Sequence, residues 1–128
     1  MSDTITRPID VDFLVSFCDA FNQHDLDALM AHMTEDCVFY ASAGPEQQGR
    51  RYAGREAVLG GFAEVFTNFP DGQWEEERHW VSGNRGVSEW VFRGTRLDGA
   101  RVEVNGCDLF TFRDGKIAVK DSFRKQRT

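Results

Sequence analysis

Apolar residues recur every three or four positions in three parts of the chain, and this pattern predicts three amphipathic helices. The first follows Asp10 and the second follows Asp25, and both aspartates are good N-cap residues. The third runs from about residue 55 to residue 68 and ends before Pro70, because proline cannot continue a helix. The positions that these stripes predict to be buried are Leu14, Phe17, Cys18, Phe21, Leu26, Leu29, Met30, Met33, Leu59, Phe62, Phe66 and Phe69.

Other parts of the chain alternate apolar and polar residues with a period of two, which is typical of strands. Turn signals at residues 82–84, 98–99 and 114–115 separate the last four strands and predict an antiparallel meander. Helices followed by a meander predict an α+β fold, in which three helices pack on a curved, mainly antiparallel sheet and close it into a cone. The expected strands are residues 37–40, 73–81, 86–97, 100–113 and 116–124, and residues 41–53 are expected to form a loop or a weak strand.

The strand at residues 100–113 carries one carboxylate on its apolar face. Every second residue from Val102 to Phe112 is apolar or glycine, except Asp108. Burial removes the hydration that favours the charged form, so the pKa of Asp108 should rise unless a cation or several donors compensate. Asp108 is therefore a candidate acid or base. The alternative is that it caps a backbone group or pairs with an arginine.

Two registers are open for the last hairpin. If residues 114–115 form a two-residue loop, Asp108 faces Asp121, and the two carboxylates push one pKa up. If residues 113–115 form the loop, Asp108 faces Lys120, which would hold it ionised. We favour the first register because it also places three apolar residues of the last strand on the Asp108 face. These are Ile117, Val119 and Phe123.

The composition describes an acidic protein without a basic groove. The chain has 128 residues and a formal net charge of -6, so we expect no binding to nucleic acid. We expect a flexible arm at residues 1–9 and one domain at residues 10–128, long enough to bury about two thirds of its unfolded surface. No apolar run has the length of a membrane span. Three widely spaced cysteines without a secretory leader predict reduced thiols and a cytoplasmic location.

The three histidines share no spacing that would place two of them on one metal ion. We therefore predict no metal site and no cofactor. We expect His24, in a turn between helices, and His79, on a strand, to be exposed to solvent. His32 lies one turn from Leu29, and it is either a core histidine with satisfied hydrogen bonds or a residue that points into the cone.

Five motifs span almost the whole chain, at residues 21–29 (FNQHDLDAL), 34–39 (TEDCVF), 54–58 (GREAV), 69–71 (FPD) and 107–117 (CDLFTFRDGKI). The order of these motifs and the distances between them resemble those of the SnoaL-like branch of the nuclear transport factor 2-like, or cystatin-like, superfamily. The resemblance implies a cone fold, a small-molecule pocket and a homodimer. The same fold hosts isomerases, cyclases, epoxide hydrolases, dehydratases and binding proteins, so it does not by itself give the function.

The resemblance also implies roles for particular residues. Asp108 matches the strand aspartate with which ketosteroid isomerase-like members donate a hydrogen bond to an oxyanion. Phe17 stands where those isomerases have a tyrosine, and Tyr40 begins the segment that covers the place of their base, so steroid isomerisation is not predicted. Cyclases of the SnoaL type use an aspartate on the last strand. Asp121 lies close to that position, and a shift of one residue would place Ser122 there instead.

We predict a pocket protein that performs cofactor-independent acid–base catalysis, of the isomerase or cyclase type, on a small apolar carbonyl compound. Asp108 and Asp121 are the predicted acid and base. The alternative is a non-catalytic small-molecule-binding or dimerisation module of the same fold, and the homodimer would use an outer sheet face with Leu109 and either Trp74 or Trp80. The predicted ligand-binding residues are Phe17, His32, Tyr40, Phe62, Trp90, Phe92, Phe110 and Arg124.

Overall fold

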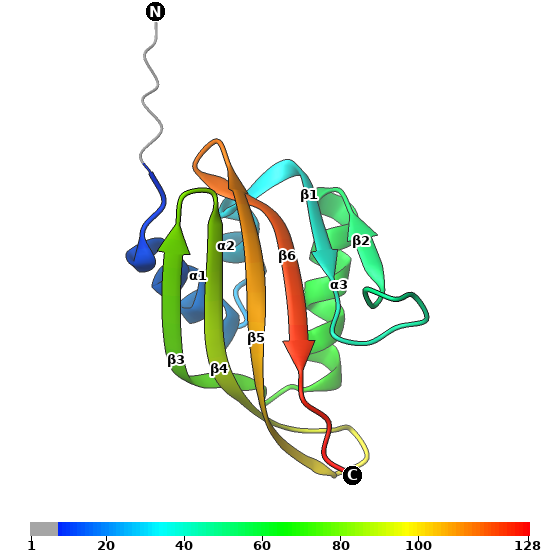
Figure 1. Ribbon diagram of the computed structural model, residues 1–128. Helices are drawn as coiled ribbons and strands as arrows, with labels where there is room; N and C mark the ends of the chain where they lie inside the picture. Colours follow the sequence, from blue (N-terminus) through cyan, green and yellow to red (C-terminus); the bar gives the residue numbers. More distant parts are fainter. Residues whose placement is uncertain (1–7) are drawn as a thin grey trace, which may run out of the picture.

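A computed structural model describes residues 8–128, in which three helices pack on the inner face of one curved sheet (Figure 1). The strand order is β2-β1-β6-β5-β4-β3, and all neighbours are antiparallel except β1 and β6. The predicted α+β architecture is therefore confirmed, while residues 1–7 of the predicted arm lie outside the described residues. The elements are α1 (Val11–Asn22), α2 (Leu26–Ala31), β1 (Met33–Tyr40), β2 (Arg51–Ala53), α3 (Arg55–Asn68), β3 (Gln73–Ser82), β4 (Arg85–Thr95), β5 (Arg101–Arg113) and β6 (Lys116–Arg124).

The first two helices begin where their cap residues predict. The carboxylates of Asp10 and Asp25 accept hydrogen bonds from the backbone N–H three residues further on, each at 3.1 Å. In α3 the buried face contains Val58 and Phe62, and the predicted burial of Leu59 is wrong. Val58 lies one full turn before Phe62 and therefore shares its face, whereas Leu59 is turned toward solvent.

The strand β1 is longer than predicted and begins at Met33 instead of Cys37. The first residues of β1 pair irregularly with β6. Met33 faces Ile117, and the register then shifts, so that Val38 faces Val119. Residues 51–53 form the weak strand β2, antiparallel to the end of β1. No helix within residues 8–128 is long and apolar enough to cross a membrane. The cytoplasmic location stays a prediction.

The last hairpin has the predicted two-residue turn, but neither predicted register is present at Asp108. Asp114 and Gly115 both have positive φ angles, as a type I′ turn requires. A bulge then leaves Ala118 without a partner on β5, so that Asp108 faces Ser122. The predicted carboxylate pair is wrong, because Asp121 faces Leu109 on the other side of the sheet. The bulge also reverses the predicted orientation of Phe123, which is 48% exposed instead of lying on the same face as Asp108.

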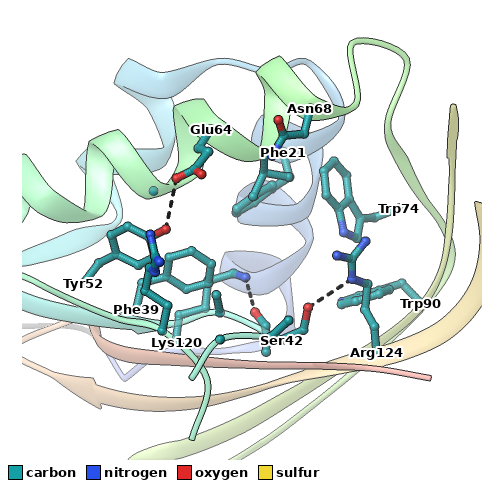
Figure 2. A pocket seen from close by; sticks show the side chains of 17 residues that line it. Phe21, Phe39, Ser42, Tyr52, Glu64, Asn68, Trp74, Trp90, Lys120 and Arg124 are labelled. Carbon is teal, nitrogen blue, oxygen red and sulfur yellow. Dashed lines mark hydrogen bonds between the residues drawn. The ribbon is translucent and has the colours of Figure 1, made fainter. Parts of the chain in front are cut away.

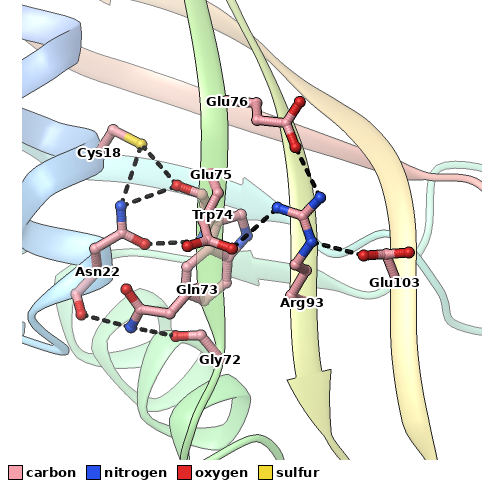
Figure 3. A network of polar contacts seen from close by, with 9 residues as sticks. All are labelled: Cys18, Asn22, Gly72, Gln73, Trp74, Glu75, Glu76, Arg93 and Glu103. Carbon is pink, nitrogen blue, oxygen red and sulfur yellow. Dashed lines mark hydrogen bonds and ion pairs between the residues drawn. The ribbon is translucent and has the colours of Figure 1, made fainter.

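A second bulge in β3 decides which side chains of that strand face the helices. The register shifts between Glu75 and Arg78, and Glu76 has a positive φ of 54°. Trp74 is buried before the bulge, and after it Trp80 is 50% exposed. Figure 3 shows Cys18 and Asn22 of α1 lying against Trp74, and Glu76 turned away toward Arg93 of β4.

Two histidines that were predicted to be exposed are not, and the bulge accounts for one of them, His79. The side chain of His79 is only 4% exposed and bonds to Ser88 at 2.7 Å, so its predicted exposure is wrong. His24 is half-buried, because it stacks on the ring of Phe66 at 4.1 Å between centroids and its Nε2 lies 2.8 Å from the carbonyl oxygen of Gly72. Both histidines are therefore held by tertiary contacts that the sequence pattern did not contain.

Candidate functional site

A buried carboxylate with three donors lies at the centre of the inner sheet face. Asp108 is 6% exposed and Lys120 is 5% exposed. Oδ1 of Asp108 lies 3.0 Å from the ammonium of Lys120 and accepts a 2.5 Å hydrogen bond from Ser122. Oδ2 of Asp108 accepts a hydrogen bond from the Trp90 indole at 3.0 Å. The cation and donors that can compensate the burial of this carboxylate are therefore all present.

The sheet register brings these four side chains together. Asp108 of β5 faces Ser122 of β6, and Lys120 lies two residues before Ser122 on the same face. Trp90 of β4 faces Gly106, two residues before Asp108. A Cβ atom at Gly106 would lie 2.4 Å from the Trp90 ring. Glycine at this position therefore allows the indole to cross the strand and reach Asp108.

The ammonium of Lys120 is surrounded by aromatic rings as well as by Asp108. Its Nζ lies 4.8 Å from the ring centroids of both Phe21 and Phe39, and 5.7 Å from that of Phe62. It also donates a 2.7 Å hydrogen bond to the hydroxyl of Ser122. A cation over ring faces is attracted by their quadrupoles, so the interior holds this charge in one place.

A cavity of about 380 Å³ opens beside this cluster, between α3, the loop after β1, the middle of β4 and the second half of β6 (Figure 2). Lys120, Ser122 and Trp90 line it, but Asp108 does not. Asp108 lines a separate hollow of about 20 Å³, which has room for about one water molecule. A ligand in the cavity would therefore meet Lys120 and Ser122, with Asp108 behind them. The complete lining is Phe21, Phe39, Ala41, Ser42, Ala43, Gly44, Arg50, Tyr52, Gly61, Glu64, Val65, Asn68, Trp74, Trp90, Lys120, Ser122 and Arg124.

Two further polar pairs occupy the cavity wall. Arg124 donates a 3.2 Å hydrogen bond to Ser42 and lies 4.9 Å from the ring centroid of Phe92, and burial lowers the pKa of this guanidinium. On the other side, the hydroxyl of Tyr52 donates to a carboxylate oxygen of Glu64 at 3.1 Å, and desolvation raises the pKa of the Tyr52 phenol. The cavity therefore offers a positive group on β6 and a carboxylate on α3 (Figure 2).

The predicted aromatic site residues divide between the cavity and the core. Trp90 lines the cavity directly, and Phe62 and Phe92 lie behind its wall, where they contact the charged groups of Lys120 and Arg124. Phe17 and Phe110 are buried against each other, with ring centroids 5.8 Å apart, next to the small hollow at Asp108.

The remaining predicted site residues lie outside the cavity lining. His32 is the C-cap residue of α2, with Nδ1 2.7 Å from the carbonyl oxygen of Ala28 and Nε2 3.1 Å from the hydroxyl of Ser16, so both ring nitrogens of this half-buried histidine have partners. Tyr40 ends β1 and faces Asp121 in the register of the parallel pair. Desolvation and the negative charge of Asp108 raise the pKa of Asp121.

Sequence reasoning identified Trp90 and Arg124 of the cavity lining but missed several polar groups that face the cavity. Lys120 entered only as an alternative neighbour of Asp108, Ser122 entered only as an alternative to Asp121, and Tyr52 and Glu64 were not considered. Simple alternation in β6 puts Ile117 and Lys120 on opposite faces, but both are buried in the structure because Ala118 is bulged. No residue near Ala118 signals that bulge.

The comparisons with known proteins agree with this geometry. A family model for the SnoaL-like domain matches residues 14–120. The chain belongs to the SnoaL-like domain family. The resemblance inferred from the sequence motifs is thus confirmed. A comparison with curated proteins found no match.

Several solved structures share the fold of this SnoaL-like chain. A candidate polyketide cyclase from Xanthomonas campestris pv. campestris has a TM-score of 0.79 at 23% identity, over 90% of this chain and 89% of that chain. A nuclear transport factor 2-like protein of unknown function from Mesorhizobium loti has a TM-score of 0.74 at 28% identity, over 94% and 98% of the two chains. TerC, co-crystallised with polyporic acid, has a TM-score of 0.75 at 18% identity, over 90% of each chain.

Proposed function

We propose that the cavity binds a small, largely apolar carbonyl compound and that Lys120 assists proton transfer on it without a cofactor. One observation carries the proposal: the Lys120 ammonium lines the cavity and is held at 3.0 Å by the buried carboxylate of Asp108. A fixed cation in a water-poor site stabilises negative charge that develops on a substrate oxygen. The fold and the family resemblance favour the isomerase or cyclase type of reaction.

The roles follow from which groups line the cavity. Lys120 would donate a hydrogen bond to the carbonyl oxygen and stabilise the enolate that forms when the neighbouring carbon loses its proton, while Ser122, whose hydroxyl proton goes to Asp108, holds the ammonium of Lys120 in place. Glu64 is the lining carboxylate that can accept this proton. Asp108 then acts as a positioning residue, since it touches Lys120, Ser122 and Trp90 and not the cavity. Asp121 takes no part, because it lies on the other sheet face.

The charge of the walls also suggests which compounds fit. Arg124, with Ser42 beside it, can bind an acidic group at one end of the ligand, while Trp74, Trp90 and Phe39 provide apolar surface. TerC was co-crystallised with polyporic acid. This compound therefore belongs in the first set of ligands to test with the present chain.

The test has a binding arm and a chemical arm. We would screen small carbonyl compounds and polyporic acid by thermal shift, and then follow proton transfer by NMR as deuterium exchange into the bound compound in heavy water. We expect Lys120→Met to slow exchange by about 10²–10⁴-fold and Asp108→Asn to slow it less. Lys116→Met, at the exposed turn of the same hairpin, is the matched control and should leave exchange unchanged.

A non-catalytic binding module is the second candidate. Both oxygens of Asp108 already have protein donors, which favours a structural role for this carboxylate. Ligand binding by the unmutated protein without any deuterium exchange would overturn the catalytic proposal in favour of this one. The absence of any stabilising ligand would favour the dimerisation module.

We also propose that the chain forms a homodimer through the outer face of its sheet. Trp80 and Phe123 support this proposal, because they are large apolar residues that are about half exposed. Sedimentation equilibrium should give twice the chain mass of 14.6 kDa, and Trp80→Glu should shift the equilibrium toward the monomer. A monomer at all accessible concentrations would contradict the proposal.

A further inference from the structure

Three side chains with different metal-ligating groups meet between α1 and β3, outside the lining of the cavity beside Lys120. They are Cys18 of α1 and Glu77 and His79 of β3, and their ligand atoms all lie within 4.8 Å of one another. Sγ of Cys18 lies 3.1 Å from one oxygen of Glu77, and Nε2 of His79 lies 3.1 Å from the other. The carboxylate thus lies between the thiol and the imidazole.

These separations are close to those that a tetrahedral zinc ion imposes. Zinc binds nitrogen and oxygen at about 2.0–2.2 Å and sulfur at about 2.3 Å, so its ligand atoms lie about 3.3–3.8 Å apart. Because one oxygen of Glu77 would ligate the ion, one of the two 3.1 Å contacts has to open by a few tenths of an ångström. The two other separations between ligand atoms are at most 4.8 Å and have to shorten by at most about an ångström. Small rotations of the three side chains are enough for this change.

The chemistry of the group also suits zinc. A thiolate, a carboxylate and a neutral imidazole are all ligands that zinc accepts, and together with the ion they make a neutral group that can stay buried. Nδ1 of His79 lies 2.7 Å from the hydroxyl of Ser88, which holds the ring in place and leaves Nε2 directed toward Cys18 and Glu77. The thiol proton would leave to solvent as the metal binds.

The bulge in β3 creates this arrangement. Glu76 takes a positive φ and pairs with Arg93 on the outer side (Figure 3). Glu77 and His79 therefore both turn inward, toward Cys18 and Ser88. The predicted absence of a metal site rested on the spacing of the histidines and on Cys107 and Asp108, which do not form a ligand pair. No local pattern connects Cys18 with a strand that begins more than fifty residues later.

We propose that Cys18, Glu77 and His79 bind one zinc ion and leave its fourth coordination position for water. This site is separate from the catalysis proposed for Lys120, and the two proposals can fail independently. Three protein ligands with one open position are the arrangement found in zinc sites that also bind small molecules.

The proposal is tested on the full chain, free of metal and of any histidine tag. Zinc would be added, the protein desalted, and bound metal measured by atomic emission and by competition with a chromogenic chelator. We expect one equivalent of zinc, and at least a tenfold loss of affinity in Cys18→Ser, Glu77→Gln and His79→Gln. Cys107→Ser and His24→Gln remove the same residue types elsewhere and should keep the affinity of the unmutated chain.

A second measurement uses the unmutated protein and does not depend on variants that fold. Zinc should protect Cys18 from alkylation, read by mass spectrometry, while Cys107 reacts equally with and without the metal. Cobalt in place of zinc should give a thiolate charge-transfer absorption. Less than a tenth of an equivalent of bound zinc, or unchanged alkylation of Cys18 in its presence, would overturn the proposal, as would equal losses of affinity in the control variants.

Discussion

The two faces of the β5–β6 hairpin carry one aspartate each, in opposite surroundings. Asp108 on the inner face is buried and has three donors, Lys120, Ser122 and Trp90. Asp121 on the outer face is half-buried, and desolvation together with the charge of Asp108 raises its pKa. The comparison teaches that the donors around a carboxylate, and not its depth alone, decide whether its charge is stabilised.

The largest expected effect comes from removing the cation of the inner face. Lys120→Met leaves the Asp108 carboxylate buried without its counter-charge, so we expect the free energy of unfolding to fall by about 3–5 kcal/mol in urea titrations. The double variant Asp108→Leu with Lys120→Met should recover most of this loss, because a buried ion pair can be replaced by apolar side chains. If the double variant is no more stable than Lys120→Met, the pair is not the origin of the effect.

Withdrawing a single donor should have a smaller effect. Trp90→Phe leaves Oδ2 of Asp108 without its indole partner and should lower the free energy of unfolding by about 1–3 kcal/mol, again measured by urea titration. Trp80→Phe, which changes an exposed tryptophan on the neighbouring strand, is the control and should cost much less. Equal losses in the two variants would show that the hydrogen bond to Asp108 contributes nothing.

The glycine that allows Trp90 to reach Asp108 gives the next test. Gly106→Ala places a Cβ 2.4 Å from the Trp90 ring and 2.4 Å from the carbonyl oxygen of Phe123, so we expect a loss of about 1–3 kcal/mol and an altered tryptophan fluorescence. Gly60→Ala on α3 has open space around the new methyl group and should stabilise the protein by about 0.5–1 kcal/mol. A neutral Gly106→Ala would mean that the strand can move away from the indole.

The smallest expected effect concerns Asp121 on the outer face, where the substitution should raise the stability of the protein instead of lowering it. Because the pKa of Asp121 is higher in the folded than in the unfolded state, its contribution to stability is present below the unfolded pKa and is lost as the pH rises through the folded value. Asp121→Asn should therefore be slightly more stable than the unmutated chain at neutral pH, and thermal melts should show this gain disappear near pH 4. A destabilised Asp121→Asn at neutral pH would remove the contrast between the faces.

The sequence predicted the secondary structure well wherever local chemistry determines it. Asp10 and Asp25 accept the expected capping hydrogen bonds, and Pro70 follows the end of α3 as expected. The strand at residues 116–124 has the predicted bounds, because Asp114-Gly115 sets its start. These features depend on backbone angles and on hydrogen bonds between residues close in sequence.

The site could be predicted only in part. The alternation around Asp108 predicts a buried carboxylate on the inner face, and this prediction is confirmed. The partner was predicted wrongly, since the favoured register put Asp121 in the place that Lys120 and Ser122 occupy. Whether an unpaired Ala118 is tolerated depends on the packing of side chains from several elements, and such packing leaves no local pattern in the sequence.

By itself, the sequence therefore determined the elements of this protein, their caps, the SnoaL-like fold and the inward position of Asp108. The tertiary structure alone decided which residues are its neighbours, because two single-residue bulges, at Ala118 and at Glu76, reassign the side chains of β6 and β3 to opposite faces. The first bulge places Lys120 beside Asp108, and the second brings Glu77 and His79 to Cys18. A strand has a side-chain period of two, so one extra residue exchanges its two faces without changing the composition of the strand.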